Sequence, residues 1–257
     1  MDNDRHEDEG LAAGDHRRLG QDLDLFAFDA EIGRGLPQWM PNGAAIRDAL
    51  EDWARDTERR WGYQRVFTPH ITNGRIFELS GHLPYFADDI YPPMATDDGD
   101  VYLRPMNCPF HMRVFAARNR SYRDLPLRFT EYGTVYRLEQ SGELQGLLRV
   151  RGMTQNDAHI FCRLEDAKAE FFDVMRLHAH YYEHLGIEDF HMVLALRDPA
   201  NVDKYHDDEA MWDTAERITR EAMDESEIPY VEELGGAAHY GPKVDFVLGT
   251  AAGKEYA

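Results

Sequence analysis

The sequence is poor in cysteine and has no long hydrophobic run. Its 257 residues include two cysteines, Cys108 and Cys162, too few for a disulfide framework. No apolar stretch approaches the ~20 residues that a membrane-spanning helix requires, and the charged N-terminus is unlike a signal peptide. The glycine-rich phosphate motifs GxxxxGKS/T and GxGxxG are also absent. We therefore expect a cytoplasmic protein with no membrane partner.

Positive charge is scarce as well. The chain has 28 basic against 48 acidic residues, a formal net charge of −20, and only four lysines. Such a surface repels nucleic acid at long range, so a polyanion would have to bind through a local basic patch. With 43% hydrophobic residues, the chain can bury the core of one large domain or two small ones.

Hydrophobic periodicity predicts a mixture of helices and strands. We expect helices over residues 44–61, 107–119, 164–185 and 207–225, and strands over residues 64–68, 191–196 and 244–248. Residues 1–14 are acidic and polar and predict a disordered tail, which leaves residues 15–257 for one domain. Residues 254–256 begin a return strand that stops at once, which predicts a truncated domain.

The segment 131–161 is the most informative part of the chain. Two runs of alternating apolar and polar residues flank a loop that contains glycine, and a strand places every second side chain on one face. A polar face is costly to bury as core, so we interpret it as the floor of a ligand site. The side chains expected on it are Arg137 and Glu139 from the first run and Arg149, Arg151, Gln155, Asp157 and His159 from the second.

Arg137, Glu139 and Arg149 could form a triphosphate site. A guanidinium offers a rigid fork to phosphate oxygens, and a nearby carboxylate can accept from an amine. A salt-bridge ladder across two strands explains the same pattern equally well. The residues alone leave both readings open.

Cys108 and His159 are candidate metal ligands. Cys108 precedes Pro109 at a predicted helix start, where a thiolate is favoured. Thiolate and imidazole are common zinc ligands, but a catalytic zinc typically has three protein ligands. A lone cysteine is more often a small buried apolar residue. His180 and His184, one helical turn apart, more simply face solvent, and Lys243 after Tyr240 and Pro242 could be an ordinary turn lysine.

Several long motifs together identify a family. They are DHRRLGQDLDLF (15–26), GYQRVFTP (62–69), LSGHLPYF (79–86), LRPMNCP (103–109), SYRDLPLR (121–128), YRLEQSGELQGLLRVRGMTQNDAHIFC (136–162), DEAMW (208–212) and YGPK (240–243). In this order they resemble the catalytic domain of threonyl-tRNA synthetase, a class II aminoacyl-tRNA synthetase. Because Cys108 and the Asp157–His159 segment are threonyl-type features, prolyl and seryl synthetases are weaker readings.

The resemblance implies an α+β fold, an antiparallel sheet flanked by helices, with residues 15–257 as a partial catalytic domain. It implies a ligase that activates threonine with ATP and Mg²⁺ and transfers it to tRNA(Thr). It also implies a homodimer built through the motif 1 region around Pro69.

The resemblance also assigns roles to residues. In the family, positions matching Arg137, Glu139 and Arg149 bind the α-phosphate, adenine and γ-phosphate of ATP. Positions matching Cys108 and His159 bind zinc, and the position of Asp157 accepts from the threonine hydroxyl. The remaining substrate-pocket positions are Met106, Gln155, Tyr240 and Lys243, and Arg137 and Lys243 are the candidate catalytic residues.

The chain also departs from the family pattern. Motif 3 and the third zinc-ligand histidine would lie beyond residue 257, so we expect the isolated chain to be inactive. Gln140, Gln145 and His239 replace residues usual in the family. The alternative is a non-catalytic paralogue that binds an amino acid or nucleotide. Retention of Arg137 and the metal-type residues favours the ligase.

Overall fold

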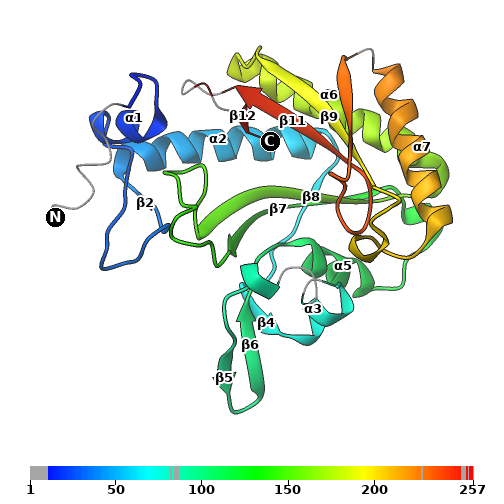
Figure 1. The fold of residues 1–257 in the computed structure, drawn as a ribbon, viewed down its shortest axis with the longest axis horizontal. Helices are drawn as coiled ribbons and strands as arrows, with labels where there is room; N and C mark the ends of the chain where they lie inside the picture. The colour runs from blue at the N-terminus through cyan, green and yellow to red at the C-terminus, as the bar shows by residue number, and fades with distance from the viewer. Residues whose placement is uncertain are drawn as a thin grey trace. The chain divides into compact units, whose positions relative to one another are not determined.

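The structure, a computed structural model, describes residues 11–81, 83, 87–226, 228–249, 253, 255 and 256. It divides into two compact units, Met1–Phe161 and Cys162–Ala257 (Figure 1). Most of the predicted tail at 1–14 lies outside the described residues, as does part of the motif at 79–86. None of the described helices has the length and apolar character needed to cross a bilayer.

The first unit is mixed α and β. Its helices and strands are, in order, α1 (His16–Asp22), β1 (Phe26–Ala27), β2 (Gln38–Trp39), α2 (Pro41–Arg60), β3 (Gln64–Arg65), β4 (Ile71–Asn73), α3 (Arg75–Leu79), β5 (Met94–Thr96), β6 (Gly99–Leu103), α5 (Cys108–Ala116), β7 (Leu127–Tyr136) and β8 (Gly152–Phe161). The strands form an antiparallel β1–β2 pair, an antiparallel sheet β4–β6–β5, and a sheet β3–β7–β8 in which β3 is parallel to β7.

The β7–β8 hairpin is the long curved ribbon of this unit (Figure 1). Its antiparallel register is unbroken from Leu127 opposite Phe161 to Tyr136 opposite Gly152. Because no bulge interrupts it, the alternation predicted for the second run holds for Gln155, Asp157 and His159. Arg149 and Arg151, predicted on the same strand face, instead lie in the loop before β8, which begins at Gly152. The hairpin therefore presents two distinct faces.

Helix α2 lies on one of these faces. The Glu58 carboxylate accepts from Asn156 Nδ2 at 2.7 Å and from Thr130 Oγ1 at 3.1 Å. The helix starts at Pro41, three residues before the predicted start, because proline is well placed in a first turn. Ile46 and Leu50, from the periodic stripe that predicted the helix, are 51% and 45% exposed. The first part of that stripe is therefore exposed, whereas Thr57, further along it, is buried at 2% exposure.

Helix α5 lies on the opposite face, where His111 contacts side chains of both strands. The helix starts at Cys108 with Pro109 in its first turn, close to the predicted position, and ends at Ala116. Between β7 and β8, residues 137–151 form a loop with one isolated bridge, Gln145 to Arg149.

The second unit packs two long helices on a four-stranded sheet. Its elements are α6 (Ala167–Leu185), β9 (Phe190–Leu196), α7 (Glu209–Glu225), β10 (Tyr230–Leu234), β11 (Lys243–Gly249) and β12 (Glu255–Tyr256). The sheet order is β10–β9–β11–β12, with β9 parallel to β10 and antiparallel to β11. Met175, Met192 and Met223 form its core cluster.

The predicted elements of the second unit are confirmed within a few residues. Gly186 ends α6 in the left-handed conformation, with φ 67°. Helix α7 begins at Glu209 rather than 207, because the Asp208 side chain caps it by accepting from the Met211 amide at 2.9 Å. The predicted α+β class with antiparallel sheets and flanking helices is confirmed, with two parallel strand pairs in addition.

Candidate functional site

The predicted ligand floor is the face of the hairpin that α5 covers. Gln155, Asp157 and His159 alternate along β8, opposite Gly133, Glu131 and Phe129 of β7. Cys108 reaches the same face because it is the first residue of α5. Residues far apart in the sequence thus meet over the centre of the hairpin.

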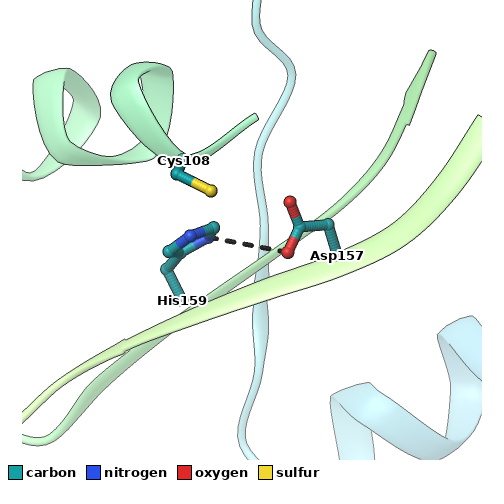
Figure 2. A group of neighbouring side chains, drawn as sticks. All are labelled: Cys108, Asp157 and His159. Atoms are coloured by element: carbon teal, nitrogen blue, oxygen red, sulfur yellow. Dashed lines mark ion pairs between the residues drawn. The ribbon is translucent and has the colours of Figure 1, made fainter. Parts of the chain in front are cut away.

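Cys108, Asp157 and His159 form a group that could hold a metal ion (Figure 2). One ligand atom of each residue lies within 4.8 Å of the others, and His159 Nδ1 lies 3.8 Å from Asp157 Oδ1. Sulfur, nitrogen and carboxylate oxygen are all zinc ligands, and three protein ligands with an open position are typical of catalytic zinc. The donor set therefore fits the zinc that the sequence predicts at Cys108 and His159, with Asp157 as a further donor.

The surroundings of this group decide its protonation. Burial, with the negative charge of Asp157, raises the pKa of Cys108 to about 11. The expectation that the helix start favours a thiolate is thus wrong for the metal-free chain, because burial outweighs the helix dipole. Burial also lowers the pKa of His159, despite the nearby Asp157, which favours the neutral imidazole that metals bind.

A buried polar network supports His159. His111 Nδ1 lies 2.8 Å from His159 Nδ1, and His111 Nε2 lies 3.1 Å from Glu131 Oε2. Glu131 also accepts from the Thr68 amide at 3.0 Å and pairs with Arg104 at 3.3 Å. Burial alone would raise the pKa of Glu131, but hydrogen bonds from His111 and Thr68 and the charge of Arg104 lower it to about 2.

Sequence reasoning missed this network. His111 and Arg104 are 0% and 1% exposed, and Glu131 is 3% exposed. The sequence does show His111 three residues after Cys108, one turn along the predicted helix. It also shows Glu131 at a position of the first strand that alternation places on one face. A contact between His111 and Glu131 cannot be inferred until the pairing of the strands is known.

The three predicted ATP residues lie in the loop between β7 and β8, outside both strands. Strand β7 ends at Tyr136, so the expectation that Arg137 and Glu139 share a strand face is wrong. Glu139 and Arg149 are brought together, with Arg149 Nε donating to Glu139 Oε2 at 2.7 Å. Arg137 Nε instead donates to the Pro105 carbonyl at 3.3 Å. The ion-pair reading left open by the sequence therefore describes Glu139 and Arg149 in this structure.

The DHRRLG motif contacts this loop. The Leu147 amide donates to His16 Nε2 at 3.0 Å. Gly146 has φ 50°, and a Cβ there would lie 2.2 Å from His16 Nε2. Glycine is therefore required at this turn both for its backbone conformation and for the close approach of His16.

Tyr240 and Lys243 lie in the second unit, and all the other predicted site residues lie in the first. Tyr240 is 60% exposed, and Lys243 Nζ donates to Asp245 Oδ2 at 2.6 Å at the start of β11. In the part of the chain that the structure describes, His180 and His184 belong to no metal-competent group.

Comparisons with known proteins identify the family of the chain. The family model for the class II tRNA synthetase core domain (G, H, P, S and T) matches residues 93–256. A threonine–tRNA ligase of Deinococcus deserti is 49% identical over 98% of the chain. The RNA binding domain of threonyl-tRNA synthetase from Cryptosporidium parvum Iowa II, a crystal structure, is 34% identical with a TM-score of 0.85, covering 95% of this chain and 59% of that one.

The chain spans only part of its relatives, 38% of the length of the Deinococcus deserti ligase. A threonine–tRNA ligase of Thermus thermophilus is matched similarly, at 48% identity over 94% of this chain and 37% of that protein. The resemblance to threonyl-tRNA synthetases predicted from the motifs is confirmed, and the chain belongs to the family of class II tRNA synthetase core domains.

Proposed function

We propose that residues 15–257 are part of the catalytic domain of a threonine–tRNA ligase. The single observation that carries this proposal is the group of Cys108, Asp157 and His159 on the hairpin floor. The group combines a thiolate, an imidazole and a carboxylate at one half-buried position, and these are donors that zinc binds. The similarity to threonine–tRNA ligases supports the same conclusion.

Selection of threonine follows from this group. When bound, zinc would supply a Lewis acid that favours a substrate with an amine and a β-hydroxyl, such as threonine. Cys108 and His159 would hold the metal, and Asp157 would either accept from the threonine hydroxyl or complete the ligand set. Valine lacks a hydroxyl, so a site built for that group would reject it strongly. Met106 and Gln155 would line the rest of the pocket in the first unit, and Tyr240 and Lys243 are the matching family positions of the second unit.

Activation of threonine would use the arginines at the end of the hairpin. A carboxylate oxygen of threonine forms a bond to the α-phosphorus of ATP, the bond from that phosphorus to the bridging oxygen breaks, and pyrophosphate leaves with the electron pair. Arg137 would neutralise the developing charge, while Glu139 would bind adenine and Arg149 the γ-phosphate, with Mg²⁺ on the phosphates. The threonyl group would then pass to the terminal ribose of tRNA(Thr).

The partner is a second copy of the chain. Ile46 and Leu50 are exposed on α2, and Phe67, next to the motif 1 proline segment, is 74% exposed. Apolar groups presented in this way support a homodimer through the motif 1 region. Such a ligase would act in the cytoplasm.

Threonine-dependent exchange of pyrophosphate into ATP tests the proposal on the gene product that carries this sequence. We expect exchange with threonine, none with valine, and stoichiometric zinc. Cys108→Ser should reduce both zinc content and exchange, whereas Cys162→Ser should change neither. A zinc-loaded product with no exchange would instead support the non-catalytic paralogue, and exchange unaffected by Cys108→Ser would contradict the assigned site.

A further inference from the structure

A chain of four side chains runs between the floor and α5, from Arg104 through Glu131 and His111 to His159. The first three are almost completely buried. Burying a charged pair and an imidazole is costly unless each polar atom has a partner. The contacts here follow one after another, so the proton positions along the chain depend on one another.

Glu131 sets the direction of these hydrogen bonds. An ionised carboxylate can only accept, and Glu131 accepts from Thr68 Oγ1 at 2.7 Å as well as from its other partners. His111 Nε2, 3.1 Å away, must therefore carry a proton and donate it. In neutral His111 the other nitrogen, Nδ1, is then an acceptor.

His159 completes the series. Its Nδ1 lies 2.8 Å from His111 Nδ1, so one of the two atoms must donate. Because His111 Nδ1 accepts, His159 Nδ1 carries the proton. The lone pair of neutral His159 is then on Nε2, one of the two imidazole nitrogens through which metals bind. In neutral His111 the opposite arrangement would set the Nε2 lone pair against the Glu131 carboxylate.

We infer that His111, held by Glu131, is a positioning residue that keeps the lone pair of His159 on Nε2 for the metal. This inference rests on the metal site of the proposed function but can be tested separately. The alternative is that this hydrogen-bond network only stabilises the folded core and has no effect on the metal site. If the network only stabilises the core, a side chain of similar shape at position 111 should preserve zinc binding. If His111 positions His159, zinc binding should require a donor and an acceptor atom at position 111.

Two substitutions in the full chain separate the accounts. Glutamine in His111→Gln can donate to Glu131 through its amide nitrogen and accept from His159 through its oxygen. Leucine in His111→Leu fills similar space and can do neither. Thr134→Val is the matched control, because it removes a hydrogen bond to Thr154 at 3.0 Å from the other face of the same hairpin.

Zinc affinity, from competition with a chromophoric chelator, is the first readout, and the cobalt(II) absorption spectrum is the second. We expect His111→Leu to weaken zinc binding by about 10- to 100-fold, as is typical when a residue behind a metal-ligating histidine is lost. His111→Gln and Thr134→Val should stay within about threefold of the unmutated chain, by the same principle. Equal affinity of His111→Leu and the unmutated chain would overturn the inference, as would equal losses in both His111 variants.

The tautomer of His159 is the third readout and needs no metal or variant. Nitrogen-15 chemical shifts in the metal-free chain should report a protonated Nδ1 and an unprotonated Nε2. The reverse assignment would overturn the inference even if zinc binds. If the unmutated chain binds no zinc, the proposed metal site fails, and the tautomer alone decides whether His111 sets the proton on His159.

Discussion

Arg149 and Glu139 neutralise each other in the nucleotide-free chain, across 2.7 Å from Nε to Oε2. Glu139 is 7% exposed, whereas the Arg149 side chain is 51% exposed and has room to change rotamer and leave the ion pair. Binding of ATP would therefore exchange this ion pair for contacts to the γ-phosphate and adenine. The pair itself is a modest source of stability, because solvent screens an exposed arginine.

Arg149→Ala should therefore separate binding from stability. We expect MgATP affinity, measured by calorimetry, to fall about tenfold or more, as for the loss of a charge-assisted contact. The free energy of unfolding should change by less than about 1 kcal/mol. Arg163→Ala, which removes a surface pair with Asp166, is the control and should leave ATP affinity unchanged. Unchanged ATP affinity in Arg149→Ala would remove this residue from the nucleotide site.

Gly133→Ala should disturb the floor directly. A Cβ at Gly133 would lie 2.2 Å from Oδ1 of Asn107, the fully buried residue before Cys108. The buried Asn107 side chain, the strand or the start of α5 must move, so we expect a loss of about 1–3 kcal/mol in the free energy of unfolding and weaker zinc binding. Gly142→Ala is the control, because nothing lies within 4 Å of its Cβ position. Equal stability of the two variants would show that α5 can shift freely.

Asp15→Asn should remove an acid-sensitive part of the stability. Hydrogen bonds from Arg17, opposed by burial, lower the pKa of Asp15 from 3.8 to about 2. Because the folded pKa is the lower one, the stabilisation is present above about pH 4 and is lost as the pH falls toward 2. Asparagine retains the cap of α1 but not the charge.

The difference in unfolding free energy between the unmutated chain and Asp15→Asn should be about 1–2 kcal/mol at pH 7. It should shrink toward zero near pH 2 in urea titrations. Arg17→Gln should reduce the same difference, since Arg17 is the main cause of the lowered pKa. A difference that does not depend on pH would contradict the assignment.

Cys108 should be a slow nucleophile in the metal-free chain. Because burial and Asp157 raise its pKa to about 11, little thiolate is present at pH 8. In a Cys162→Ser background, the rate of alkylation by iodoacetamide should keep rising through pH 9 and 10. Cys108→Ser reports the remaining thiol, Cys162, under the same conditions. A plateau of the alkylation rate below pH 9 would show that the position at the helix start lowers the pKa of Cys108 more than burial raises it.

Much of the fold could be predicted because local patterns decide it. Gly186 ends α6 by its own conformational freedom, and the alternation in β8 needs only the strand period. The boundary of β7 at Tyr136 could not be read locally, because polar alternation continues into the loop. Exposure of Ile46 and Leu50 was also hidden, since a periodic apolar stripe does not say what covers it.

The candidate site was predictable in its ligands and not in their support. Family motifs marked Cys108 and His159 as metal ligands and Asp157 as a threonine-binding residue, and the structure brings the three together. No motif identified His111 and Glu131 as supporting residues. Their role depends on the pairing of β7 with β8 and on the packing of α5 against the hairpin. Long-range placement of this kind is decided by tertiary packing, which a local pattern does not contain.

The unbroken register of β7 and β8 makes the site sensitive to chain length. Removing one residue from the first half of β8 would turn Asp157 and His159 toward α2 and bring Asn156 and Ala158 under α5. Removing two would restore the side but displace both ligands by about 7 Å along the strand. Insertions and deletions should therefore be tolerated within the exposed tip of the loop at 137–151 and excluded from the strands that flank it.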